Sequence, residues 1–192
     1  MELYAGVDLH SNNGYFGVVN KEGKRIFNKR LANDLPTVLS ALGPLKPEIV
    51  EIVVESTYNW YWLVDGLMES GYSVRLANPA GIQQYDGLKH ANDKTDAFFL
   101  CELLRLGILA EGYIYPKEER PVRDLLRRRM MLVQQRTSHI LSFQTMIGRE
   151  TGKGITARDI KKLEEGDVDE LLNEKHLVLI GETNVATIRF LT

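Results

Sequence analysis

Residues 3–10, LYAGVDLH, form an apolar run that ends in the polar residues Asp8 and His10. This pattern predicts a buried β-strand that carries Asp8 at its carboxyl end. The next four residues, SNNG, are a turn signal, and two further strands are predicted at YFGVVN (15–20) and KRIFNKRL (24–31). Because only short turns separate these three strands, we expect an antiparallel meander.

Beyond the meander, helical and strand patterns alternate. EIVEIVVES (48–56) is rich in β-branched residues, which predicts a buried parallel strand that ends near Glu55. The neighbouring elements are a helix capped by Asn33 or Asp34, a helix at 58–71 and a fifth strand at 72–78. The order β-β-β-α-β-α-β predicts an α/β fold with a mixed five-stranded sheet covered by helices.

The remaining chain is expected to be mostly helical. A loop or short helix at 80–92 leads to a helix at 94–105, and a linker then leads to a long helix from about Glu118. In that helix an apolar residue recurs every seven positions, which is typical of packing on a partner helix: Leu126, Val133, Ile140 and Ile147. The glycines that can end it are Gly148, Gly152 and Gly154. We therefore expect a domain at 1–112 and a coiled-coil-like helical region at 113–192.

Four acidic residues fall where this fold would bring them together. Asp8 and Glu55 end predicted strands, and ligand sites of open α/β sheets lie at strand carboxyl ends. Asp93 and Asp96 are three residues apart at the start of a helix, so both side chains can share a face. Converging carboxylates repel one another, and Mg²⁺, which prefers oxygen ligands, relieves that repulsion. Two such ions about 4 Å apart can hold the attacking and leaving oxygens of a phosphodiester.

Each of these acids also has an ordinary structural interpretation. Asp93 and Asp96 can cap their helix and complement its dipole, and Glu55 can be a surface acid at the end of a strand. Asp8 directly follows the apolar residues of its strand, and a buried acid needs partners. The four acids in this order on this topology are more specific than any one of them.

Charge is unevenly distributed along the chain. The net charge is -2, but residues 117–136 contain seven basic and three acidic residues, a local net charge of +4. Arginines three or four positions apart share a helix face that can contact nucleic-acid phosphates, with an affinity that falls as salt rises, or can simply be solvated. The candidate nucleic-acid contacts are Lys94, Arg120, Arg123, Arg127, Arg128, Arg129 and Arg136. Lys94 can equally form ion pairs with the aspartates beside it.

Composition excludes several classes of protein. A content of 44% hydrophobic and 26% charged residues is ordinary for a folded globular domain. No apolar run is long enough to cross a bilayer, and the N-terminus, MELYAGVDLH, has no basic segment typical of a signal peptide. The single cysteine, Cys101, excludes an internal disulfide and fits a reducing compartment. We expect a cytoplasmic protein with no membrane association, and a core position for Cys101.

Several segments resemble the N-terminal DEDD domain of insertion-sequence 110 type transposases, which are related to the Piv and MooV DNA invertases. The most specific segment is DKTDA (93–97) followed by LLRLG (103–107), and ESTY (55–58) with ANP (77–79) supports it. The other matching segments are GVDLHSNNGYFGVV (6–19) and LLRRRMMLVQQRTSHI (125–140). The resemblance implies a RuvC-like member of the RNase H fold. It also implies that Asp8, Glu55, Asp93 and Asp96 are the metal-binding, catalytic residues.

The resemblance carries further expectations about function. It implies a DNA transposase or site-specific recombinase that uses two Mg²⁺ ions, for which Mn²⁺ can substitute, and a structured guide RNA as a partner. It also implies a dimer or tetramer assembled partly through the long helix. Members of the family have a second, C-terminal transposase domain with a nucleophilic serine. Because 192 residues leave no room for that domain, we expect the chain to be a fragment that does not complete recombination alone.

Other functions remain open at this point. A Holliday-junction-resolvase-like nuclease and a non-catalytic nucleic-acid-binding or oligomerisation module are the closest alternatives. Kinases of the sugar-kinase and actin superfamily also open with a meander around an aspartate, but they follow it with a phosphate-binding glycine that Asp8-Leu9-His10-Ser11 lacks. His10 can reach a metal or a phosphate, or simply face solvent. The aromatic residues near Glu55 can stack on bases, but the spacing of Trp60, Leu63 and Leu67 favours a core helix.

Overall fold

The structure, a computed structural model, describes residues 1–82 and 93–192, with the backbone alone for residues 93–95 and 165. The chain forms two compact units, Met1–Ile114 and Tyr115–Thr192. The sequence placed the boundary between residues 112 and 113. None of the helices in the described ranges is both long enough and apolar enough to cross a membrane.

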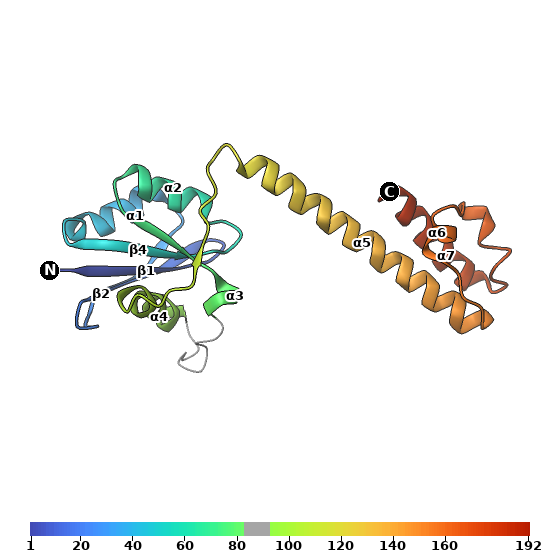
Figure 1. Ribbon diagram of the computed structural model, residues 1–192, viewed down its shortest axis with the longest axis horizontal. Helices are drawn as coiled ribbons and strands as arrows, with labels where there is room; N and C mark the ends of the chain where they lie inside the picture. The colour runs from blue at the N-terminus through green and yellow to red at the C-terminus, as the bar shows by residue number, and fades with distance from the viewer. Residues whose placement is uncertain (83–92) are drawn as a thin grey trace. The chain divides into compact units, whose positions relative to one another are not determined.

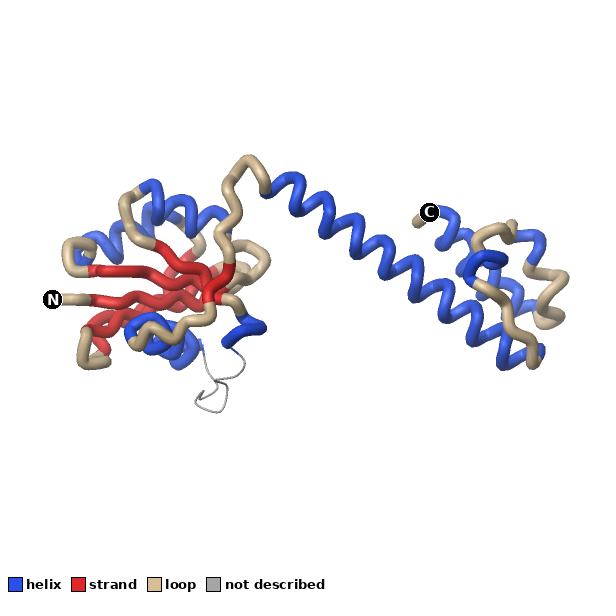
Figure 2. Tube along the Cα trace, in the orientation of Figure 1, coloured by secondary structure: helices blue, strands red, loops and turns tan. Residues whose placement is uncertain are grey.

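The first unit is built on a mixed sheet, drawn in red in Figure 2. Its strand order is β3-β2-β1-β4-β5-β6. β1, β4 and β5 are parallel, and β2 and β6 run antiparallel to their neighbours. The strands are β1 (Leu3–Leu9), β2 (Asn13–Asn20), β3 (Arg25–Ala32), β4 (Ile49–Glu55), β5 (Val74–Ala77) and β6 (Glu111–Gly112). The predicted RNase H-like fold class is confirmed, with a sixth strand of two residues that the sequence did not predict.

Helices cover both faces of this sheet (Figure 1). One face is covered by α1 (Leu35–Leu42) and α2 (Tyr61–Glu69), and the other by α4 (Asp93–Arg105). Successive side chains of a strand point into the two cores in turn. In β4, Val54 packs with Leu63 of α2, whereas Val53 packs with Leu100 of α4. The chain also forms two short segments, η1 (Gly43–Leu45) after α1 and α3 (Pro79–Ile82) after β5. The remainder of the loop predicted at 80–92 lies outside the described residues.

Two glycines let α4 lie close on the sheet. A side chain at Gly6 would collide with the backbone of α4 at Ala97 and Cys101, and one at Gly17 would meet the ring of Phe98 at 3.0 Å. Cys101 is fully buried there, as predicted, and its thiol donates a hydrogen bond to the carbonyl oxygen of Gly17 over 3.3 Å. α4 therefore packs directly across β1 and β2.

The second unit consists of the helices α5 (Arg120–Thr151), α6 (Ala157–Ile160) and α7 (Lys175–Phe190) and the 3-10 turn η3 (Glu165–Asp167). Its core joins Ile140, Phe143 and Ile147 of α5 to Val185 and Ile188 of α7. The four residues of the predicted heptad pattern therefore differ in burial along the helix. Its last two members are buried within this unit, whereas Leu126 is 60% exposed.

Candidate active site at the carboxyl edge of the sheet

Asp8 and Glu55 lie side by side at the ends of adjacent parallel strands. Val7 of β1 is in register with Val54 of β4, so the two acids are each the next residue along the chain. Side chains alternate along a strand, and Gly6 and Val53 both face α4. Asp8 and Glu55 therefore project on that same face. Asp8 is only 5% exposed, which places one carboxylate at the edge of the core.

The direction of α4 brings two further acids to this edge. At the C-terminal end of α4, Arg105 donates a hydrogen bond from Nη1 to the carbonyl oxygen of Lys21 over 3.0 Å. Lys21 follows Asn20, which pairs with Leu3 at the amino end of β1. α4 therefore runs antiparallel to β1, and its first turns lie toward the strand ends that carry Asp8 and Glu55. Asp96, half-buried, precedes Ala97, the residue that lies over Gly6.

The four predicted acids differ in how far the structure describes them. The side chains of Asp93 and of Lys94 lie outside the described residues, and only their place in the first turn of α4 is given. Among the side chains that are described, no group of three or more histidines, cysteines and acids is close enough to hold a metal ion. The structure thus brings Asp8, Glu55 and Asp96 to one face and one edge of the sheet without a preformed three-ligand cluster.

The loop that follows Asp8 is held by two asparagines. Asn59, beyond β4, and Asn33, beyond β3, each donate a hydrogen bond from Nδ2 to the carbonyl oxygen of His10 over 2.9 Å. Asn59 Oδ1 in turn accepts from the hydroxyl of Thr57 over 2.9 Å. These contacts tie the chain after Glu55 to the chain after Asp8. The contact between Asn59 and His10 could not be predicted from the sequence, because the two residues are 49 positions apart and no local pattern marks the pair.

His10 and the aromatic residues have distinct placements. His10 lies beside the site, with Nε2 3.4 Å from Oδ2 of Asp8. Trp60 is 2% exposed and packs edge-to-face on Tyr61, so its predicted core position is confirmed. Tyr58, three residues after Glu55, is 80% exposed.

The arginines of α5 that were predicted to contact nucleic acid differ in their burial and in their partners. Arg120 is 7% exposed and donates from Nε to the carbonyl oxygen of Tyr115 over 2.8 Å. Arg123 stacks on the ring of Tyr115 and pairs with Asp124 at 3.1 Å. Arg120, Arg123 and Arg127 have the spacing that predicted a shared phosphate-binding face. The buried position of Arg120 does not favour its part in such a face. Arg136 donates from Nη1 toward the carbonyl oxygen of Leu191 over 3.5 Å.

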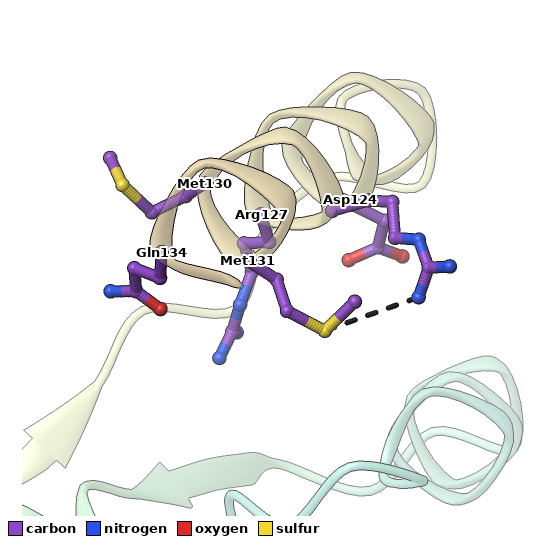
Figure 3. Close-up of a pocket in the computed structure, with 6 residues that line it drawn as sticks. Asp124, Arg127, Met130, Met131 and Gln134 are labelled. Carbon is purple, nitrogen blue, oxygen red and sulfur yellow. Dashed lines mark hydrogen bonds between the residues drawn. The ribbon is translucent and has the colours of Figure 1, made fainter. Parts of the chain in front are cut away.

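In the first half of α5 the exposed basic residues are the consecutive Arg127, Arg128 and Arg129. Figure 3 shows Arg127 and its neighbours Met130, Met131 and Gln134 projecting from the helix. The dashed line in that view joins Nη1 of Arg128 to the sulfur of Met131 over 4.0 Å, a long and weak contact.

The chain is similar to known proteins in both structure and sequence. Among solved structures the chain is similar to T. thermophilus RuvC in complex with a Holliday junction substrate, with 16% sequence identity, a TM-score of 0.45, and coverage of 58% of this chain and 100% of that chain. No curated protein matches the chain. A family model described as a transposase, that of the DEDD transposases of insertion-sequence 110 type, matches residues 5–148, which is 144 of 192 residues. The chain belongs to this transposase family.

Proposed function

We propose that the first unit is the catalytic domain of a DNA transposase or site-specific recombinase, and that it cleaves phosphodiesters with the help of Mg²⁺. The observation that carries the proposal is the placement of Asp8, Glu55 and Asp96 at one edge and on one face of the sheet. Membership in a transposase family supports the same class of reaction. A structured guide RNA that selects the DNA is part of the proposal.

The donor set fits a hard divalent cation. Carboxylate oxygens are the ligands that Mg²⁺ and Mn²⁺ prefer, and the proposed ligands are Asp8, Glu55, Asp93 and Asp96. Asp8 is a buried acid at the edge of the core, where an added positive charge offsets the cost of burying its negative charge. When bound, the metal supplies Lewis-acid stabilisation of the charge that develops on the phosphate.

The protein's own residues would place and orient this chemistry. The parallel register of β1 and β4 sets the spacing of Asp8 and Glu55. The close contact of α4 with Gly6 of β1 sets how near Asp96 lies to the sheet. The asparagine contacts at the carbonyl of His10 hold both strand-end loops in one arrangement. Such preorganisation reduces the reorganisation needed when charge develops in the transition state.

Metal titration tests the site with a matched pair of variants on one strand. Glu55→Gln and Glu51→Gln each remove one negative charge from β4, but Glu51 lies about 13 Å further from the carboxyl edge and pairs with Arg75 at 2.8 Å. In calorimetry, the affinity for Mn²⁺ should fall by at least about tenfold in Glu55→Gln and stay unchanged in Glu51→Gln. Equal binding by wild type and Glu55→Gln would contradict the proposed site.

The second unit supports nucleic-acid binding through the exposed arginines of α5. Arg127, Arg128 and Arg129 are all exposed, and a net charge of +4 over residues 117–136 favours phosphate contacts independent of base sequence. Replacing the three arginines by Ala should weaken binding of DNA and RNA alike and flatten its salt dependence. A triple variant of Lys161, Lys162 and Lys175, which are exposed in the same unit, removes the same charge and serves as control.

The exposed first half of α5 supports assembly of two or more copies. Leu125, Leu126 and Met130 are 68%, 60% and 55% exposed, which is unusual for apolar residues of one helix segment. A homo-oligomer in which such helices pack together would bury them. Light scattering on wild type and on Leu126→Glu separates this arrangement from a monomer, since only an oligomer would dissociate in the variant.

A further inference from the structure

A row of side chains crosses the sheet at the level of the carboxylates. Asp8 of β1 is in register with Tyr15 of β2, and Tyr15 is in register with Arg30 of β3. Residues paired across strands project on the same face of a sheet. Tyr15 and Arg30 therefore share the face of Asp8, and Gly17, two residues after Tyr15, faces Phe98 of α4 in agreement.

Arg30 is the basic member of this row. Its side chain is exposed, and its Nε donates a hydrogen bond to Oδ1 of Asn13 over 2.8 Å. Across the described parts of the chain no carboxylate forms an ion pair with it. The contact through Nε orients the guanidinium and does not use either Nη group. An arginine held in this way is suited to a phosphate, which accepts two parallel hydrogen bonds.

The spacing of the row suits a polyanionic strand. Two strand intervals separate Asp8 from Arg30, about 10 Å, a distance of a few nucleotides along nucleic acid. A strand whose reacting phosphate sits at the carboxylates would therefore pass over Tyr15 and place a later phosphate at Arg30. Tyr15, half-buried between the two, lies where the intervening sugar would pass.

We propose that Arg30, oriented by Asn13, binds a non-reacting phosphate of the DNA strand that is cleaved at the carboxylates. This inference rests on the proposed function, because it assumes that DNA occupies the carboxyl edge of the sheet. Arg30 is a positioning residue here, since it contacts the substrate strand away from the reacting atoms. It fixes the direction in which the strand crosses the sheet.

Lys29 provides a matched control on the neighbouring position. It is also exposed and carries the same charge, but it pairs with Phe16 and therefore projects on the opposite face, where Phe16 joins the core under α1 and α2. Its Nζ lies 5.9 Å from the ring centre of Phe27. Lys29→Ala and Arg30→Ala thus remove one positive charge each from adjacent residues on opposite faces of β3.

The test measures binding of the full chain to a fluorescein-labelled four-way DNA junction, with Ca²⁺ in place of Mg²⁺ to limit cleavage. Arg30→Ala should weaken binding about five- to tenfold and lower the slope of log Kd against log salt by about 1. Arg30→Lys should keep the salt slope but lose part of the affinity, because the ammonium cannot form the paired hydrogen bonds. Lys29→Ala should change the Kd less than about twofold.

Neutral methylphosphonates, placed one at a time along a junction strand, give the decisive readout. One position should weaken binding by wild type and have no effect on Arg30→Ala, as expected when the two changes remove the same contact. Equal losses in Lys29→Ala and Arg30→Ala, or penalties that persist in Arg30→Ala at every position, would overturn the role of Arg30 alone. A wild-type chain that binds Mn²⁺ but no junction DNA would overturn this inference, and a chain that binds neither would overturn the proposed function as well.

Discussion

At the scale of single residues, Gly6 sets how closely α4 approaches the carboxylates on β1. An alanine at this position would place its Cβ against the carbonyl of Ala97 and within 2.9 Å of the backbone nitrogen and the sulfur of Cys101. Because the obstacle is helix backbone, the strain cannot be relieved by a side-chain rotation. Gly6→Ala should lower the free energy of unfolding by about 3 kcal/mol in urea titrations and weaken Mn²⁺ binding as α4 moves outward.

Gly43 supplies the control for that substitution. It has helical backbone angles, φ -49° and ψ -47°, and a Cβ there would meet nothing within 4 Å. Gly43→Ala should leave stability unchanged or raise it by up to about 1 kcal/mol, since it restricts the unfolded chain. If both variants are equally stable, the close approach at Gly6 does not limit the packing of α4.

Cys101 gives the first unit a dependence on alkaline pH. Burial raises the pKa of its thiol far above the usual value, so the thiol stays protonated in the folded protein. The unfolded chain loses this proton above about pH 8.5, so below that pH the residue makes no pH-dependent contribution. Above it, stability should fall by up to about 1.4 kcal/mol per pH unit, and the fall should be shallower in Cys101→Ala. Parallel stability curves of wild type and variant between about pH 8 and pH 10 would refute this.

Single residues also show where sequence reasoning reaches its limit. Asp8 and Glu55 could be placed at strand ends because the apolar runs before them are local patterns. The burial of Arg120 could not be predicted, because it depends on a contact with Tyr115 that helical spacing does not reveal. To predict that Asp8, Tyr15 and Arg30 lie in one row, the register of three strands must be known. The bulge that shifts the pairing between Val18 and Val19 leaves no signal in the sequence.

At the scale of elements, one of three candidate glycines ends the long helix. Gly152 caps α5 with φ 69° and donates its N–H to the carbonyl of Gly148 over 3.0 Å. That left-handed conformation costs residues with a Cβ about 1 to 2 kcal/mol. Gly152→Ala should therefore lower the free energy of unfolding of the second unit by about 1 kcal/mol in denaturant titrations.

Gly154, two residues later, is the comparison for Gly152. Its φ is not positive, and a Cβ there would meet nothing within 4 Å. Gly154→Ala should be neutral, and an equal loss of stability in the two variants would mean that the cap conformation is not the cause. The sequence offered Gly148, Gly152 and Gly154 as equals, because composition alone does not say which glycine adopts the left-handed conformation.

The heptad of α5 was predictable as a pattern, but its partner was not. An apolar stripe indicates only that something covers it. In the structure, α7 of the same chain covers the end that carries Ile140 and Ile147, while Leu126 stays exposed. The two-residue strand β6 escaped prediction for a related reason, since it joins the sheet through the backbone of Glu111 and Gly112 and needs no apolar alternation.

At the scale of the whole molecule, the two units have separate cores. The buried residues of the first unit pack around the sheet, and those of the second unit join α5, α6 and α7. Each unit should therefore unfold in its own transition. Mn²⁺ should raise only the midpoint of the transition that belongs to the first unit, because a ligand stabilises the part that binds it.

Substitutions in each core assign these transitions. Phe143 is fully buried in the second unit, and Phe143→Ala should lower the stability of that unit by about 3 to 5 kcal/mol while Mn²⁺ affinity stays at the wild-type value. Leu63, fully buried under the sheet, gives the reciprocal variant, and Leu63→Ala should lower the other transition by about 2 to 5 kcal/mol and reduce Mn²⁺ binding near the transition temperature. Calorimetric scans in which both variants shift one common transition would show that the units unfold cooperatively. Two independent transitions would mean that the metal site depends on the first unit alone, and that changes in α5 act on nucleic-acid binding without disturbing the carboxylates.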